Sequence, residues 1–120
     1  MSGIKWLLET NVVIGLLKQH TATIALIESH TFDLSKAAVS QITRMELLGF
    51  PNLAQKEESA ILDLMQNCRI LFIDDATEQK AIQLRRTRHC KLPAAIIAVT
   101  ALVHDLTLLT LDQRLQNLMA

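Results

Sequence analysis

Aromatic residues are scarce in this 120-residue chain, which has three Phe, one Trp and no Tyr. All four aromatics, Trp6, Phe32, Phe50 and Phe72, stand in or beside runs that resemble core segments. An aromatic platform on which nucleic-acid bases stack is therefore not expected. Because half of the residues are hydrophobic, the core must be mainly aliphatic. The two cysteines are too few for a disulfide scaffold and have no zinc or redox spacing.

An excess of one charge is also absent, since 12 Lys and Arg residues balance 12 Asp and Glu residues. Any contact with nucleic acid must then come from a local basic patch rather than from a global field. No apolar stretch approaches the roughly 18 residues that a membrane span needs. A basic segment followed by a long apolar run is missing from the N-terminus, so no signal peptide is expected. We expect a cytoplasmic protein with no membrane contact.

The spacing of hydrophobic residues predicts short strands that alternate with helices. Strands are expected at 4–8, 37–40, 69–73 and 106–110. Helices are expected at 12–19, 22–30, 43–49, 55–67, 75–89, 93–103 and 113–119. Strands separated by helices favour a parallel sheet that is covered on both faces. We therefore predict one α/β domain over residues 1–120, with a central sheet of about four parallel strands.

Several predicted helices begin with recognisable start signals. Thr43 and Glu46 fit a capping box, and Asp75 with Glu78 is a second candidate cap. Asp112 suits the N-cap of the last helix. Pro93 suits the first turn of the most apolar helix, which we expect to be central and buried.

Three acidic residues, Glu9, Glu46 and Asp112, stand just beyond strand ends or in the helix that follows. Parallel strands point their carboxyl ends the same way, so these carboxylates are able to converge. A carboxylate cluster is best tolerated around Mg²⁺ or Mn²⁺, and such a site cleaves phosphodiesters by activating water. Each residue also has a structural explanation, as a helix cap or as a partner of a helix dipole. Asn11 is likewise either an N-cap or an amide that orients ligands.

Four segments in this order resemble the PIN-domain family, and most of all its VapC-type toxin ribonucleases. They are LLETNVVI at 7–14, SQITRMELLG at 40–49, LPAAIIA at 92–98 and LTLLTLD at 106–112. The resemblance implies a three-layer PIN-like fold and a Mg²⁺-dependent endoribonuclease. It also implies a homodimer that is neutralised by a small antitoxin protein.

The chain departs from the family pattern at two positions that matter for the chemistry. The family has Asp at position 9 and at position 94, where this chain has Glu9 and Ala94. The resemblance implies that Glu9, Glu46 and Asp112 ligate the metal, whereas Asn11 and Thr110 orient these acids. Glu9 keeps the charge on a longer side chain, and a misplacement of roughly 1 Å can slow a reaction about 100-fold. Ala94 removes a carboxylate outright, so we expect weakened or absent cleavage.

Two functions follow from these residues. The first is a weakened Mg²⁺-dependent endoribonuclease, and the alternative is an inactive PIN domain that binds antitoxin or RNA and forms dimers. A third interpretation is that positions 9 and 94 were changed to silence a toxin. Candidate contacts to RNA phosphates are the basic residues that lead into the Pro93 turn, Arg85, Arg86, Arg88 and Lys91. Their structural alternative is a solvated helix face whose charge suits the helix C-terminus.

Overall fold

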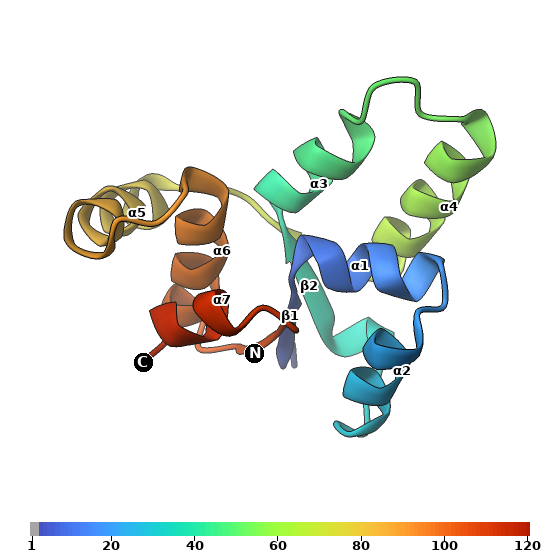
Figure 1. The fold of residues 1–120 in the computed structure, drawn as a ribbon, viewed down its shortest axis with the longest axis horizontal. Coiled ribbons are helices and arrows are strands. Elements are labelled where there is room, and N and C mark those ends of the chain that lie inside the picture. Colours follow the sequence, from blue (N-terminus) through green and yellow to red (C-terminus); the bar gives the residue numbers. More distant parts are fainter. Residues whose placement is uncertain (1–2) are drawn as a thin grey trace.

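A computed structural model of the chain describes residues 3–120, in which short strands alternate with helices (Figure 1). The strands are β1 (Trp6–Leu8), β2 (Ala37–Ser40), β3 (Arg69–Leu71) and β4 (Thr107–Leu109). The helices are α1 (Thr10–Leu17), α2 (Thr21–Glu28), α3 (Gln41–Leu48), α4 (Gln55–Gln66), α5 (Asp75–Arg88), α6 (Leu92–Val103) and α7 (Gln113–Leu118), and a 3-10 helix (Leu34–Lys36) precedes β2.

The four strands form one parallel sheet in the order β3-β2-β1-β4. β1 is central, because Leu7 pairs with Ala38 of β2 on one side and with Leu108 of β4 on the other. All strands run in the same direction, so the residues that follow them meet at one edge of the sheet. The predicted α/β fold with a parallel sheet of four strands is confirmed.

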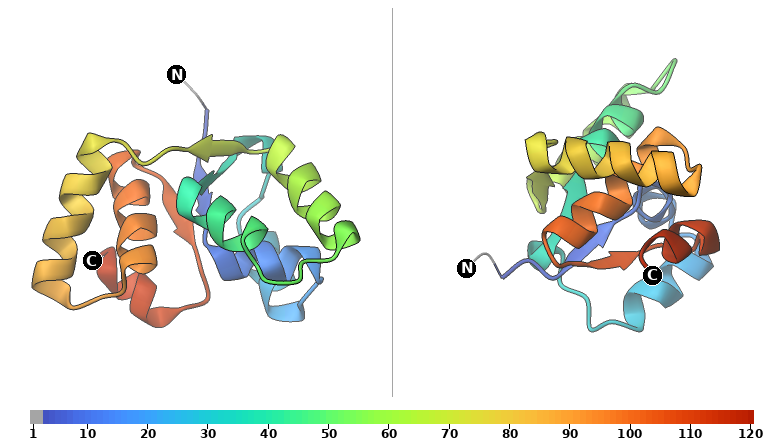
Figure 2. Two further views of the ribbon diagram at one scale, coloured as in Figure 1. Left: turned by 90° about the horizontal axis from the view of Figure 1, so that it is seen from above. Right: turned by 90° about the vertical axis from the view of Figure 1, so that its left-hand side faces the viewer.

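Helices cover both faces of the sheet and give the protein three layers. α1, α2 and α4 lie on one side, and α5, α6 and α7 lie on the other (Figures 1 and 2). Side chains alternate along β1, so that Trp6 and Leu8 enter one core with α1 and α4 while Leu7 enters the other with α6 and α7. α3 contacts α1, α4 and α6 and so joins the two helical layers.

α6 is the buried helix that the sequence predicts. Its seven consecutive residues from Ala95 to Ala101 are all buried, between the sheet on one side and α5 on the other. Pro93 lies in the first turn of α6, where its missing N–H leaves no hydrogen bond unmade.

The predicted capping box at Thr43 and Glu46 is wrong. The Ser40 hydroxyl accepts a 3.1 Å hydrogen bond from the Ile42 N–H, and Ser40 is the N-cap of α3. Because β2 ends at Ser40 itself, the helix begins about one turn earlier than the capping-box pattern suggests. Thr43 is consequently a fully buried residue inside α3.

The cap of α5 is also shifted, by one residue. Asp74 rather than Asp75 is its N-cap, and the Asp74 carboxylate accepts a 2.8 Å hydrogen bond from the Thr77 N–H. Hydrogen bonding to Thr77 lowers the pKa of Asp74. The predicted N-cap role of Asp112 in α7 is confirmed.

Two further expectations need correction. The predicted strand 69–73 ends at Leu71, and the other helix and strand ends either agree with the prediction or differ by one or two residues, as is usual for fraying termini. Phe50 and Phe72 are 61% and 67% exposed, so only Trp6 and Phe32 among the aromatics belong to the core. No helix within residues 3–120 is long and apolar enough to cross a lipid bilayer.

Candidate functional site

Glu9 follows β1 directly and is the most deeply placed of the three predicted acids, with only 6% of its surface exposed. Its Oε1 accepts a 3.0 Å hydrogen bond from the Thr110 hydroxyl, and its Oε2 accepts a 2.7 Å bond from the Asn11 N–H. Glu9 is thereby the N-cap of α1. Both oxygens of this buried carboxylate already have protein donors, which is the condition for burying a charge at tolerable cost.

Thr110 connects Glu9 to Asp112. The Thr110 hydroxyl donates to Glu9 and accepts a 3.0 Å hydrogen bond from the Asp112 N–H. The Asp112 side chain turns toward α7, where its Oδ1 accepts from the Arg114 N–H at 2.9 Å. The same oxygen lies 3.8 Å from the Arg114 Nε, but this exposed ion pair adds little stability.

Glu46 joins the same edge through Thr10, the residue next to Glu9. The Thr10 hydroxyl donates a 2.8 Å hydrogen bond to Glu46 Oε1. Thr10 and Thr43 have their hydroxyl oxygens 2.9 Å apart, and since the Thr10 proton is committed to Glu46, Thr43 is the donor in that pair. Glu46 itself is exposed.

The structure therefore gathers Glu9, Glu46, Thr110 and Asp112 at one edge, linked by hydrogen bonds through two threonines. Asn11 contributes its backbone N–H, whereas its side chain is exposed. Within residues 3–120, however, no three Asp, Glu, His or Cys side chains lie close enough together to hold a metal ion. Glu9 and Asp112 use carboxylate oxygens as helix caps, and position 94 supplies none. The side chains as placed do not fit a divalent cation.

A cavity of about 510 Å³ lies beside Asp112 and contains Ala94 in its wall. Its lining residues are Arg88, His89, Cys90, Lys91, Ala94, Asp112, Arg114, Leu115, Asn117 and Leu118. Three permanent positive charges thus face a single carboxylate. The local field at this cavity favours an anion such as a phosphate over a cation.

The four predicted RNA contacts divide into two pairs. Arg88 and Lys91 line this cavity, whereas Arg85 and Arg86 do not. Arg88 Nη2 donates to the carbonyl of Asn117 at 3.0 Å, and Arg85 Nε donates to the carbonyl of Cys90 at 3.1 Å. Part of the basic cluster therefore holds the α5–α6 connection in place.

An apolar groove of about 490 Å³, which sequence reasoning missed, lies between α1 and the α3–α4 connection. It is lined by Ile14, Leu17, Lys18, Leu47, Phe50, Pro51, Asn52, Leu53, Lys56, Glu57, Ala60 and Ile61. A signal was present, because Phe50 and Pro51 follow the helix-ending Gly49 and belong to no helical stripe. An exposed aromatic beside a concave apolar surface is typical of a binding site.

The parallel sheet in the order β3-β2-β1-β4, with helices on both faces (Figure 1) and acids at its carboxyl edge, defines the class as a three-layer α/β fold. The chain belongs to the PIN-domain family, whose model matches residues 6–119. A search of curated proteins finds no match.

Several solved structures have the same fold. A toxin–antitoxin complex from Klebsiella pneumoniae contains a chain with 27% identity and a TM-score of 0.77, covering 92% of this chain and 88% of that one. FitAcB from Neisseria gonorrhoeae has 25% identity and a TM-score of 0.76, covering 95% and 92%. VapBC2 from Rickettsia felis, bound to a promoter DNA fragment, has 17% identity and a TM-score of 0.76, covering 96% and 93%, and at that identity it supports the fold alone.

Proposed function

We propose that this chain is the toxin-type partner of a toxin–antitoxin pair that works by binding, with RNA cleavage strongly reduced or lost. The observation that carries this proposal is the state of the Glu9 carboxylate, which is buried and has both oxygens hydrogen-bonded to Thr110 and Asn11. As placed, no three Asp, Glu, His or Cys side chains of residues 3–120 can share one ion, so Glu9 would have to move away from Thr110 and Asn11 to join a metal site. Each buried group left unpaired by that movement costs about 1–3 kcal/mol.

The charge around Ala94 also disfavours a metal ion. With Arg88, Lys91 and Arg114 facing only Asp112, the cavity next to Ala94 repels a divalent cation and attracts a phosphate. We therefore assign it to the RNA backbone. Contacts to phosphates hold RNA without reading its sequence, and their strength falls steeply with salt concentration.

The proposed site for the antitoxin is the apolar groove between α1 and α4. The Klebsiella pneumoniae complex that shares this fold pairs a toxin with an antitoxin. A groove with Phe50 and Leu53 among its lining residues suits the apolar face of an amphipathic segment. Lys18 and Lys56, which also line the groove, would pair with acidic residues of that segment. We further propose, from the family resemblance, that the chain is a homodimer in the cytoplasm.

A second candidate is a weakened endoribonuclease that depends on Mg²⁺ or Mn²⁺. Glu9, Glu46 and Asp112 would have to move together from their present places to hold the ion, and Asn11 and Thr110 would position these acids. The observation in favour of this function is the hydrogen-bonded chain of residues that already links the three acids at one edge. The bound ion would supply an activated water for phosphodiester hydrolysis.

Restoring the family residues separates the two candidates. We would compare the natural chain with Ala94→Asp and with Glu9→Asp/Ala94→Asp for binding and cleavage of single-stranded RNA in Mg²⁺ and in Mn²⁺. The binding function predicts that the natural chain retains RNA without cutting it, whereas the double variant cuts. Equal cleavage by both proteins would establish the endoribonuclease instead. Glu58→Asp and Ala76→Asp, at exposed sites on α4 and α5, are matched controls.

The antitoxin groove has its own test. Co-expression with the small protein encoded next to this one should give a complex that Phe50→Asp disrupts. Phe72→Asp is the control, since Phe72 is as exposed as Phe50 but lies outside the groove. Equal complex formation by both variants would rule out the groove as the docking surface.

A further inference from the structure

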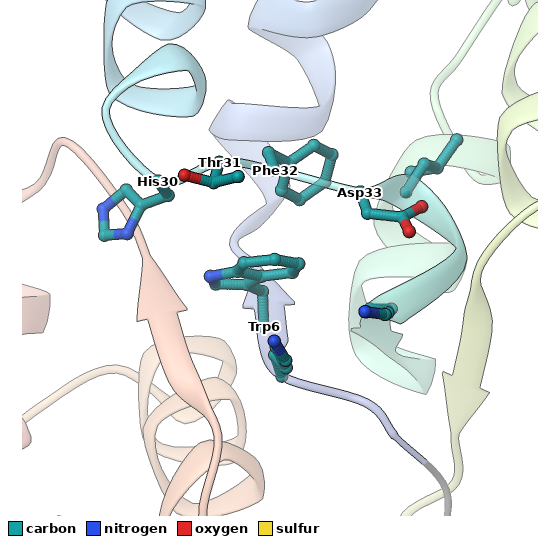
Figure 3. A pocket seen from close by; sticks show the side chains of 8 residues that line it. Trp6, His30, Thr31, Phe32 and Asp33 are labelled. Carbon is teal, nitrogen blue, oxygen red and sulfur yellow. The ribbon is translucent and has the colours of Figure 1, made fainter.

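A separate cavity of about 640 Å³ opens at the amino ends of β1 and β2, away from the acidic edge (Figure 3). Its lining residues are Lys5, Trp6, His30, Thr31, Phe32, Asp33, Leu34 and Lys36. Lys5 and Lys36 immediately precede the two strands, and the Lys5 N–H donates a 2.7 Å hydrogen bond to the Lys36 carbonyl. This backbone bond keeps the two lysines side by side.

Trp6 is the central wall of this cavity and is only 7% exposed. Its ring centroid lies 5.1 Å from that of Phe32 at an angle of 47°, and the Lys5 ammonium lies 5.9 Å from the indole centroid. The ring face therefore already has partners in Phe32 and Lys5. A nucleobase would have to displace one of them in order to stack on Trp6, so the edge of the indole is the part left for a ligand.

The indole N–H of Trp6 makes no hydrogen bond to any residue in the range 3–120. In Figure 3 its nitrogen edge faces the side of the cavity where His30 and Thr31 lie. The Trp6 nitrogen is not among the buried side-chain atoms that lack a partner in residues 3–120, so it reaches the solvent that fills the cavity. The N–H is therefore available to donate to an acceptor bound there.

The charges around the cavity define the kind of acceptor. Asp33 is the single carboxylate in the lining, and its Oδ1 is held by the N–H and the hydroxyl of Ser35 at 3.0 and 2.7 Å. The hydrogen bonds from Ser35 lower the pKa of Asp33, and Lys36 and Lys5 add a smaller effect in the same direction. Asp33 thus stays ionised and turned toward its own 3-10 helix. The ammonium groups of Lys5 and Lys36 and the indole N–H of Trp6 remain as donors for a ligand. Asp33 is the one negative charge among the lining residues.

We propose that this cavity is a binding site for an oxyanion, the phosphate or carboxylate group of a small ligand. Trp6 Nε1–H donates the central hydrogen bond, and Lys5 and Lys36 supply the opposing charge. The volume lies in the usual range of about 300–1,000 Å³ for small-molecule sites. This site shares no residue with the acidic edge or with the groove near Phe50, so it is independent of the proposed function.

The test uses the fact that Trp6 is the only tryptophan in the chain. Its indole N–H gives a single cross-peak in a nitrogen-15 correlation spectrum, which reports on the cavity directly. We would titrate inorganic phosphate and, separately, citrate at constant pH and ionic strength, with chloride as the reference anion. The expected result is a saturable downfield shift with at least one of the two. Saturation by phosphate alone, by citrate alone or by both identifies the source of the oxyanion, and no saturable shift with either overturns the proposal.

Variants connect the shift to the named donors. Lys5→Gln and Lys36→Gln should each weaken binding about 10-fold or more, since one charge-assisted hydrogen bond is worth roughly 1.5–3 kcal/mol. Lys80→Gln, at an exposed lysine of α5 that lines none of the three cavities, should change nothing. An unchanged affinity in Lys36→Gln and Lys5→Gln would contradict the site. Trp6→Phe removes the N–H donor while keeping an aromatic ring, and its anion binding would be measured by calorimetry. If Trp6→Phe does not fold, the two lysine variants still test the site.

Discussion

The hydroxyl of Thr110 donates a 3.0 Å hydrogen bond to the carboxylate of Glu9, and so joins two residues that are 101 positions apart in the chain. Both side chains are at least nine-tenths buried. Glu9 follows the central strand β1 and Thr110 follows its neighbour β4, so this bond ties two strand ends together and also orients the start of α1.

Replacing Thr110 with valine tests this connection. Thr110→Val keeps the shape of the side chain but deprives Glu9 Oε1 of its donor and the Asp112 N–H of its acceptor. We expect the free energy of unfolding to fall by about 1–3 kcal/mol, measured by urea titration. Thr107→Val, at an exposed position of β4, should stay within about 0.5 kcal/mol of the natural chain. Equal losses in the two variants would contradict the prediction.

Gly15 lies in α1 where α1 meets α2, and it has no room for a side chain. A Cβ there would overlap Thr23 Oγ1 and come within 2.7 Å of Thr23 Cβ, and Thr23 is only 2% exposed. Gly15→Ala should therefore destabilise the protein by about 1–3 kcal/mol through overpacking. Helix propensity alone would predict a gain of up to about 1 kcal/mol. In a double-mutant cycle the loss should shrink in a Thr23→Ala background, and an undiminished loss would mean that this contact is not the cause.

The start of α3 gives a third prediction, which compares Ser40 with Glu46. Ser40→Ala removes the acceptor for the Ile42 N–H and should cost about 0.5–2 kcal/mol in thermal or chemical unfolding. Glu46→Ala removes only an exposed contact with Thr10 and should cost about 0.5 kcal/mol or less. The reverse order of the two losses would indicate that the helix begins at Thr43 after all.

The fourth prediction concerns the reactivity of Cys68, whose thiol packs against the core that contains α4. Burial raises the pKa of this thiol from 9.0 to about 11. In a Cys90→Ala variant, which leaves Cys68 as the single thiol, alkylation by iodoacetamide should show an inflection near pH 11. At pH 8 the folded protein should hold about 100-fold less thiolate than an unperturbed cysteine. An inflection near 9.0 would show that burial does not govern this thiol.

The raised pKa of Cys68 also makes the free energy of unfolding depend on pH. Below pH 9.0 the Cys68 thiol is protonated in both the folded and the unfolded state. Its full contribution to the free energy of unfolding is therefore present there. Between 9.0 and about 11 the unfolded state loses its proton first, and the unfolded state then binds fewer protons than the folded one. The free energy of unfolding must therefore fall as pH rises through this window. Cys68→Ala should flatten the slope.

Local patterns predicted the elements better than their ends. The alternation of short apolar runs and helical stripes indicated all four strands and all seven α-helices found in residues 3–120, but not the 3-10 helix at Leu34–Lys36. The predicted caps Thr43 and Asp75 are wrong, because Ser40 and Asp74 are equally competent caps that come a few residues earlier. The residue that becomes the N-cap is decided by where the preceding segment leaves the sheet.

By itself, the sequence determined the order of strands and helices, the presence of Glu9 and the lack of a carboxylate at position 94. Periodicity and residue identity are local properties, and no tertiary contact alters them. Only the tertiary structure decided that Glu9 is hydrogen-bonded to Thr110, that Phe50 lies exposed beside a groove, and that Lys5, Lys36 and Trp6 line one cavity. These relationships arise from the register of parallel strands that are far apart along the chain, which local spacing does not specify.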